Sequence, residues 1–219
     1  LGTNDVGQDI FSEMVYGTRV SLYIGIFAAF IVTGVGTVLA LVSGYFGGVA
    51  DKIITAITNI AMAVPSLPLT VLLIAYLNPG KWSLIIAISI TAWTGTARIL
   101  RARVMQLKEL PFIKIEKTMG VHPAVILFKH ILPNIKDIIL TRGAMAISGA
   151  MMTEAGLSFL GLGEFGEKSW GSVLHYAFFR NSIMKKQYWW YVPPIVCICV
   201  CVLGFMLIGY YGKIKKGGE

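Results

Sequence analysis

The residues that could catalyse a reaction or hold a metal are few and scattered. Cys197, Cys199 and Cys201 alternate within an aliphatic stretch, so on a helix the first and third share a face while the second points elsewhere. Metal binding would need deprotonated thiols in that apolar setting, which favours cysteines that pack or face lipid. The histidines are widely spaced: His122, His130 and His175. The chain has no HExxH motif, paired carboxylates or Ser/His/Asp set, so we expect no catalytic residue and no metal site.

A glycine-rich segment raises the possibility of nucleotide binding. Residues 161–166 (GLGEFG) match G-x-G-x-x-G. That fingerprint binds a dinucleotide only when it follows a strand and opens a helix in a βαβ unit, and no strand pattern precedes it here. The Walker A pattern G-x-x-x-x-G-K-[ST] is also missing from the sequence. We therefore expect this chain to bind neither ATP nor a dinucleotide, and to carry no cofactor of its own.

The composition indicates that the elements positioning these residues lie in a membrane. Of 219 residues, 56% are hydrophobic and 14% charged, and the mean hydropathy is +0.72. Soluble domains are about 45–50% apolar and about 25% charged. One soluble core of this size could not bury the excess, because a domain this long still exposes much of its surface. The composition excludes a soluble enzyme and a disordered regulator, and three closely spaced cysteines exclude a disulfide-framed domain.

Stretches with few charges predict an all-α, polytopic membrane protein, with the lipid bilayer as its surroundings. Continuous apolar runs of about 20 residues cross a bilayer as helices, whereas barrel strands alternate. Five spans are expected, at about 20–46, 53–77, 82–105, 135–153 and 190–211. They form a single transmembrane domain over 20–212, with a loop at 106–134, another at 154–189 and a tail at 213–219.

The basic residues predict the orientation of these spans. Twelve Lys and Arg residues fall in the loops on the C-terminal side and six on the other side. The positive-inside rule then places the C-terminus in the cytoplasm of a multi-pass cell-membrane protein. The net charge of +8 is explained by one membrane face, so we expect no nucleic-acid binding. Segment 1–19 lies outside, which predicts a first helix upstream and six helices in the complete unit.

The inside loop 106–134 is the longest cytoplasmic segment, and its spacing predicts two short amphipathic helices. Gly120 separates them, and Pro123 stands near the first position of the second, where proline is tolerated. Such an elbow lies in the headgroup layer or docks on a soluble subunit, and the residues alone leave both open. The outer segment 154–189 is rich in glycine and tryptophan.

Within the spans, two patterns could matter for transport. Gly36, Ala40 and Gly44 recur every fourth place and form a close-packing face for another helix. Prolines interrupt the second span, and broken helices near the midplane often line a pathway, although a packed kink fits equally well. The pathway or gating candidates are Pro65, Ser66, Pro68, Trp93 and Glu154. Arg142 and Asp137 are interpreted as charges near the membrane interface.

Several motifs together resemble the dipeptide/oligopeptide/nickel branch of ABC importer permeases. Residues 1–9 (LGTNDVGQD) are similar to the branch's L-G-T-D-x-x-G-R-D, and 16–22 (YGTRVSL) continue the match. Residues 130–134 (HILPN) look like its H-x-L-P-N. Residues 154–163 (EAGLSFLGLG), followed by WG at 170–171, resemble its E-A-x-L-S-F-L-G-L-G…W-G segment. The resemblance covers nearly the whole chain.

The resemblance implies a type I ABC importer transmembrane fold and an assembly. Its members work with a second permease subunit as a heterodimer, two ABC ATPase subunits that hold ATP and Mg²⁺, and an extracellular substrate-binding protein. The chain would then translocate a small solute, most often di- or oligopeptides, and would not itself be an enzyme. Loop 106–134 would couple to the ATPases, with these candidates: Lys114, Glu116, Met119, Gly120, Val121, His122, Pro123, His130, Pro133 and Asn134. The external-loop candidates, expected to face the binding protein or cap the pathway, are Gly161, Gly163, Trp170 and Gly171.

This sequence departs from the family pattern at identifiable positions. The family's loop carries E-A-A-x-x-x-G; aligned on Gly120, its first Glu is Lys114 here, and Glu116 is the available substitute. In the opening motif Asn4 replaces an Asp and Gln8 an Arg. A nickel chelate or an oligosaccharide remains an alternative cargo. A channel, a secondary transporter and a membrane enzyme are alternative classes, which would need buried ionisable residues or a catalytic set.

Overall fold

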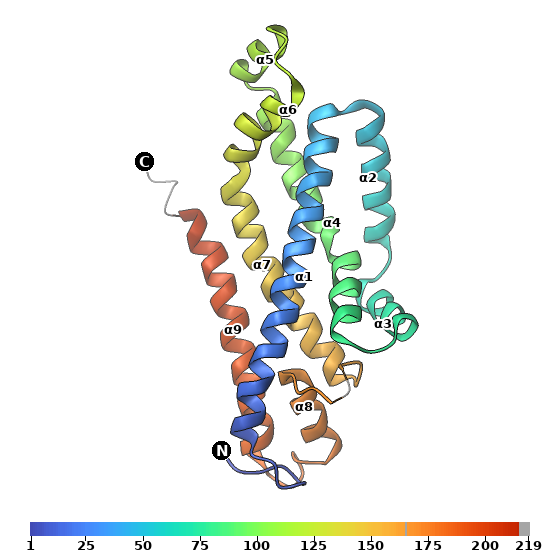
Figure 1. Cartoon of the computed structure of the whole chain (residues 1–219), viewed down its shortest axis with the longest axis vertical. Helices are drawn as coiled ribbons and strands as arrows, with labels where there is room; N and C mark the ends of the chain where they lie inside the picture. Colours follow the sequence, from blue (N-terminus) through green and yellow to red (C-terminus); the bar gives the residue numbers. More distant parts are fainter. Residues whose placement is uncertain (165, 215–219) are drawn as a thin grey trace.

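The computed structural model describes residues 1–164 and 166–214, and most of them are helical. Four long helices lie side by side in an elongated bundle: α1 (Ile10–Phe46), α4 (Lys81–Lys108), α7 (Leu132–Phe159) and α9 (Tyr188–Ile214). Figure 1 shows α5 at one end of this bundle, and α8 with the N-terminus at the other. The short elements are α2 (Gly48–Ala63), α3 (Ser66–Leu77), α5 (Pro111–Thr118), α6 (Pro123–Val125), a π-helical turn η1 (Ile126–Ile131) and α8 (Trp170–Phe179).

Helix α1 begins earlier than the expected span. Asp9 caps it, because its carboxylate accepts the backbone N–H of Ser12 at 2.9 Å and the Ser12 hydroxyl at 2.8 Å. These hydrogen bonds hold the pKa of Asp9 below its usual value. The helix has 37 residues and is about 55 Å long at 1.5 Å per residue, longer than the hydrocarbon core. It therefore extends beyond the apolar layer at its N-terminal end, within the segment 1–19.

The small-residue face of α1 packs against α4 of the same chain. A methyl group placed on Gly36 would stand 2.9 Å from Thr96, and one placed on Gly44 would stand 2.8 Å from Val104. Two backbones can approach this closely only where a side chain is missing. The prediction of a close-packing face is confirmed. Because its partner lies within the chain, this face gives no argument for a second subunit.

The second predicted span is broken at the prolines. Helices α2 and α3 meet at an angle of 89°, with Val64 and Pro65 between them. Val64 precedes a proline, which disfavours the α conformation, and its ψ of 126° is extended. The helix that was expected to run over 53–77 is therefore two helices, and α3 turns away from the bundle axis (Figure 1).

Among the described residues, three helices are long and apolar enough to cross a membrane: α1, α4 and α9. The bent pair α2–α3 makes a fourth if it counts as one span. The remaining expected span, at 135–153, corresponds to α7, whose 28 residues include four charged ones, at 136, 137, 142 and 154. It is about 42 Å long, so its length suffices although its composition is less apolar.

Loop and span boundaries shift because several helices are longer than expected. Helix α4 continues to Lys108, and α7 starts at Leu132, so Pro133 and Asn134 belong to its first turn rather than to a loop. At the outer end α7 reaches Phe159 and α9 starts at Tyr188, which shortens the expected loop 154–189. Of the expected tail 213–219, residues 215–219 lie outside the described part of the chain.

Candidate functional site

The elbow between α5 and α6 is built around Gly120. This residue has φ +77°, a left-handed conformation that glycine adopts without steric cost. The turn is closed by hydrogen bonds from the Gly120 N–H to the Lys117 carbonyl at 3.2 Å, and from the Val121 N–H to the Glu116 carbonyl at 3.1 Å. His122 then caps the next helix, its Nδ1 accepting the Ala124 N–H at 3.3 Å. The predicted helix–glycine–helix arrangement is confirmed.

The second arm of the elbow is not a separate short helix. Pro123 begins α6 with its ring at the first helical position, and α6 passes through η1 into α7 without a loop. The backbone is therefore helical from Pro123 to Phe159. A displacement of the elbow would act directly on α7, because no flexible connection separates them.

Helix α5 is anchored to the bundle by its inner face. Ile113 is 2% exposed and belongs to a buried cluster with Tyr45, Val104, Leu107, Ile126, Ile131 and Ile135. Val121 is half-buried and packs on the same cluster, so part of its side chain is covered within this chain. Met119 is 75% exposed, and Phe112 and Ile115 are exposed too. The outward face of the elbow is therefore apolar and unpartnered within the described residues.

A close contact between a histidine and a carboxylate joins the two arms of the elbow. His130 Nε2 lies 3.0 Å from Glu116 Oε1, and the side-chain amide of Asn134 donates to the His130 carbonyl at 2.6 Å. The second carboxylate oxygen of Glu116 is buried and has no hydrogen-bond partner among the described residues. Glu116 is thus directed toward η1 of its own chain. The pair fixes α5 relative to η1.

Lys114, at the position of the family's first glutamate, is exposed. Its ammonium lies 2.9 Å from the Glu109 carboxylate, just before α5. The hydrogen bond and the charge of Lys114 hold the pKa of Glu109 below its usual value. The solvent side of α5 is therefore basic where the family pattern is acidic.

A cavity of about 810 Å³ lies at the break between α2 and α3. Two of the five pathway candidates, Pro65 and Ser66, line it. Hydroxyl groups make part of its wall, with Thr70 and Thr91 3.2 Å apart. The remaining lining comes from α2, α3, α4 and the outer end of α7 with Leu160. The candidates that are not among its lining residues are Pro68, Trp93 and Glu154.

Glu154 is a buried tie between helices. Its side chain is 0% exposed and accepts hydrogen bonds from Ser158 at 2.7 Å and from Ser21 of α1 at 3.0 Å. Ser21 in turn accepts the backbone N–H of Trp170 at 3.2 Å. The carboxylate therefore connects α7 with α1 and with the start of α8. It does not line the cavity at the α2–α3 break, and its role as a pathway or gating residue stays a prediction.

Trp170 and Gly171 are internal, so they do not face an external partner as expected. Trp170 is 2% exposed, and its indole N–H donates to the Met14 carbonyl at 3.1 Å. A methyl group on Gly171 would stand 2.5 Å from the Ala155 carbonyl oxygen. The tryptophan–glycine pair thus packs α8 tightly on α1 and α7. The other two external-loop candidates are also glycines. Gly161 has φ +84° and lies in the turn after α7. Gly163 packs on the Ser158 hydroxyl.

Arg142 lies deeper than an interface charge. One guanidinium nitrogen is 3.5 Å from where a methyl group on Gly95 would lie, and Gly95 is at the middle of the 28-residue α4. Another nitrogen points at the Met145 sulfur, 3.8 Å away. The Nε atom is buried without a partner among the described residues. The interpretation of Arg142 as a near-interface charge is wrong.

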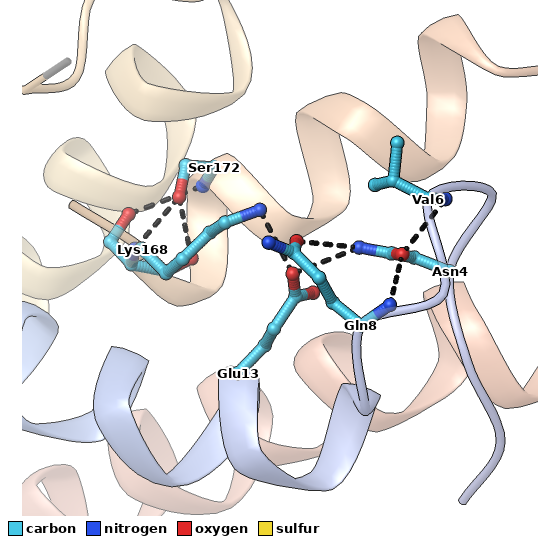
Figure 2. Close-up of polar contacts among 7 residues, drawn as sticks. Asn4, Val6, Gln8, Glu13, Lys168 and Ser172 are labelled. Atoms are coloured by element: carbon cyan, nitrogen blue, oxygen red, sulfur yellow. Dashed lines mark hydrogen bonds and ion pairs between the residues drawn. The ribbon is translucent and has the colours of Figure 1, made fainter. Parts of the chain in front are cut away.

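The N-terminal segment forms a polar network that sequence reasoning did not identify (Figure 2). The Asn4 amide donates to Glu13 and to Gln8, both at 3.0 Å, and Lys168 pairs with Glu13 at 2.9 Å. Asn4 Oδ1 also accepts the backbone N–H groups of Val6 and Gln8. The signal was available in the sequence, because Asn4 and Gln8 are the two departures from the opening motif. They are hydrogen-bonded partners, so an amide pair stands where the family has an acid and a base.

Comparison with known proteins agrees with the motifs. The family of binding-protein-dependent transport system inner membrane components matches residues 36–212. The oligopeptide transport system permease of Bacillus subtilis (strain 168) is 37% identical over 212 residues, which cover 95% of this chain and 68% of that protein. The dipeptide transport system permease of the same strain is 32% identical, covering 95% and 65%. The glutathione transport system permease of Pectobacterium atrosepticum is 36% identical, covering 95% and 69%.

The chain spans about two thirds of the length of these relatives. Its fold is also that of a solved transporter. A chain of the methionine ABC transporter MetNI, in an inward-facing conformation, matches with a TM-score of 0.74 and 18% identity. The match covers 92% of this chain and 94% of that one, and it shows the expected transmembrane architecture of a type I ABC importer. The chain therefore belongs to the family of binding-protein-dependent transport system inner membrane components, the permeases of ABC importers.

Proposed function

We propose that this chain is a translocating subunit of an ATP-driven importer of di- and oligopeptides. It works beside a second permease subunit, and an external binding protein delivers the peptide. ATP and Mg²⁺ bind to two separate ATPase subunits, so the chain itself catalyses no reaction. The C-terminus and the elbow face the cytoplasm, and the end with α8 faces outward.

Sequence similarity is the observation that carries this proposal. Relatives that match 95% of the chain at 32–37% identity are named permeases of oligopeptide and dipeptide transport systems. A nickel chelate or an oligosaccharide has no comparable support in these names. The exposed apolar side chains of the elbow support a protein partner there. Apolar side chains that lie together on a surface are a mark of protein–protein contact, because covering them removes apolar area from water.

The geometry supports a direct coupling of ATPase movement to α7. The Glu116–His130 pair fixes α5 on η1, and η1 continues into α7. If the ATPases move the elbow, α7 tilts as a lever, and its outer end carries Glu154 and its ties to α1 and α8. A rigid helix can thereby link movement inside to opening and closing outside.

The proposal is tested by reconstituting the full transporter in proteoliposomes and measuring ATP-dependent uptake of a labelled tripeptide. Met119→Asp places a charge on the apolar docking face, where desolvation opposes binding. We expect uptake and peptide-stimulated ATP hydrolysis to fall at least about tenfold, because desolvating a charge costs several kcal/mol. Met119→Leu, which keeps an apolar side chain, is the matched control and should behave like the wild type.

Two outcomes separate the parts of the proposal. If the wild-type complex hydrolyses ATP but imports no peptide, the assignment of peptides as cargo is wrong. If Met119→Asp retains full coupling, the elbow is not the ATPase contact.

A further inference from the structure

The cavity at the α2–α3 break has a distinctive chemical lining. Its walls carry hydroxyl groups from Ser66, Thr70, Thr91, Thr94 and Thr153 among apolar side chains, and none of its lining residues is acidic or basic. Two arginines stand at its border. Arg142 lies against Gly95, and Arg98 donates toward the sulfur of Met62; both Gly95 and Met62 line the cavity.

Both guanidinium groups lack a strong acceptor. The hydrogen bonds they make go to thioether sulfurs, each at 3.8 Å: Arg98 to Met62 and Arg142 to Met145. A thioether is a weak acceptor, whereas a guanidinium offers five N–H donors. The buried Nε of Arg142 has no partner at all within the described residues. An ionised side chain near the middle of a membrane helix is costly and is retained where it has a function.

The glycine at position 95 brings Arg142 to the cavity wall. Gly95 and Arg98 are three residues apart on α4, so they share one face of the helix. Because Gly95 has no side chain, the Arg142 guanidinium can lie close against α4 beside a residue that lines the cavity. The two arginines therefore each contact a cavity-lining residue, Arg142 at Gly95 and Arg98 at Met62.

From this arrangement we propose that the cavity is a subsite for a carboxylate of the transported solute, bound by Arg142 with Arg98 beside it. A guanidinium binds a carboxylate through two parallel N–H···O bonds. The inference rests on the proposed function, since each peptide carries a carboxylate at its C-terminus. It assigns the permease itself a part in cargo selection, in addition to the binding protein.

The experiment compares uptake of trialanine with uptake of its C-terminal amide in proteoliposomes containing the complete transporter. The carboxylate-to-amide uptake ratio is measured for each permease variant with the same binding protein, so selection by the binding protein cancels between variants. In Arg142→Gln the ratio should fall about tenfold, as for loss of one hydrogen bond to a charged group. Arg142→Lys keeps the charge without the fork and should lie between the two. Arg98→Gln should lower the ratio less, because Arg98 is exposed.

Arg103→Gln is the matched control, because this arginine is exposed on α4 and bonds Gln106 away from the cavity. Its ratio should equal that of the wild type. If the Arg142 and Arg98 variants assemble and their ratio equals that of the wild type, the inference is overturned. This includes a result in which uptake of both peptides falls equally, as it would if Arg142 paired with another subunit. Absence of uptake of either peptide by the wild type would instead overturn the proposed function.

Discussion

Gly120 is the residue on which the shape of the elbow depends. Its φ of +77° is accessible to glycine, while a methyl group there would meet nothing within 4 Å. The constraint is therefore in the backbone and not in packing. A β-branched residue in this conformation costs on the order of 1–2 kcal/mol, and the turn would relax away from it.

Replacing Gly120 tests this directly. Gly120→Val should leave the complex assembled but lower peptide-stimulated ATP hydrolysis and uptake together, because α5 would be displaced from its docking position. Gly120→Asn is the control, since asparagine tolerates positive φ and should retain most of the activity. Both rates are measured in proteoliposomes. Wild-type coupling in Gly120→Val would show that the bend is not needed for transmission.

The charge of Lys114 gives a second prediction at this scale. In the wild type the Lys114 ammonium lies 2.9 Å from the Glu109 carboxylate. Lys114→Glu restores the family residue but puts a second carboxylate next to Glu109. The two carboxylates would repel each other, so we expect the start of α5 to loosen and coupling to fall. The double variant Lys114→Glu with Glu109→Lys restores the pair with reversed charges, and ATPase stimulation should recover. Wild-type ATPase stimulation in the single variant Lys114→Glu would mean that the ion pair is irrelevant to coupling.

At the scale of helices, close approach of α1 and α4 holds the bundle together. Gly36 is buried, and a methyl group on it would stand 2.9 Å from Thr96, inside normal contact distance. Gly34, two residues earlier on the same helix, is exposed and has nothing within 4 Å of the same position. Both residues are glycines of α1, but only Gly36 packs closely against another helix.

Substituting these glycines separates packing from helix propensity. Gly36→Val should force the helices apart and cost about 1–3 kcal/mol, lowering the melting temperature of the detergent-solubilised complex. Gly34→Val introduces the same side chain at the open position and should melt like the wild type. Equal melting temperatures for the two variants would contradict close packing of α1 on α4.

At the scale of the whole molecule, α7 links the elbow at one end to the buried Glu154 near the other. Ser21 and Ser158 donate to this carboxylate, which is how α1 and α7 are tied beside the start of α8. Both functional ends thus depend on a single continuous helix, so damage at the outer tie should weaken stability and transport together.

Removing this carboxylate tests the tie. Glu154→Ala leaves two buried hydroxyls without their acceptor, and we expect a loss of about 1–3 kcal/mol of stability and a lower melting temperature in detergent. Glu164→Ala removes a partly exposed carboxylate from the same end of the molecule, where its ion pair with Lys81 spans 3.8 Å. Glu164 also accepts the Lys81 backbone N–H at 3.3 Å, but because its contacts are partly exposed to water this control should lose less stability than Glu154→Ala. If Glu154→Ala melts at the same temperature as the wild type, the hydrogen bonds of this carboxylate do not stabilise the fold.

Much of the fold and part of the site could be predicted from local features. Hydropathy placed the long helices, the proline at position 65 placed the break, and Gly120 placed the elbow, because each effect acts within a few residues of its cause. The boundaries were less accurate. Helix α7 extends back to Leu132 through η1, and for that reason Arg142 lies deeper than a span starting near 135 suggested.

Sequence alone therefore established the helical membrane class, the family and the helix–glycine–helix elbow, since hydropathy, helix breakers and motifs are properties of short segments. Only the packed structure showed that the α1 glycines face α4, that Trp170 and Gly171 are internal, and that Glu154 ties α7 to α1. These facts depend on which helix faces meet, and helix faces distant in sequence are brought together by packing and by the 89° bend. A linear pattern shows that a face is small or polar, but the neighbour that the face meets is decided in three dimensions.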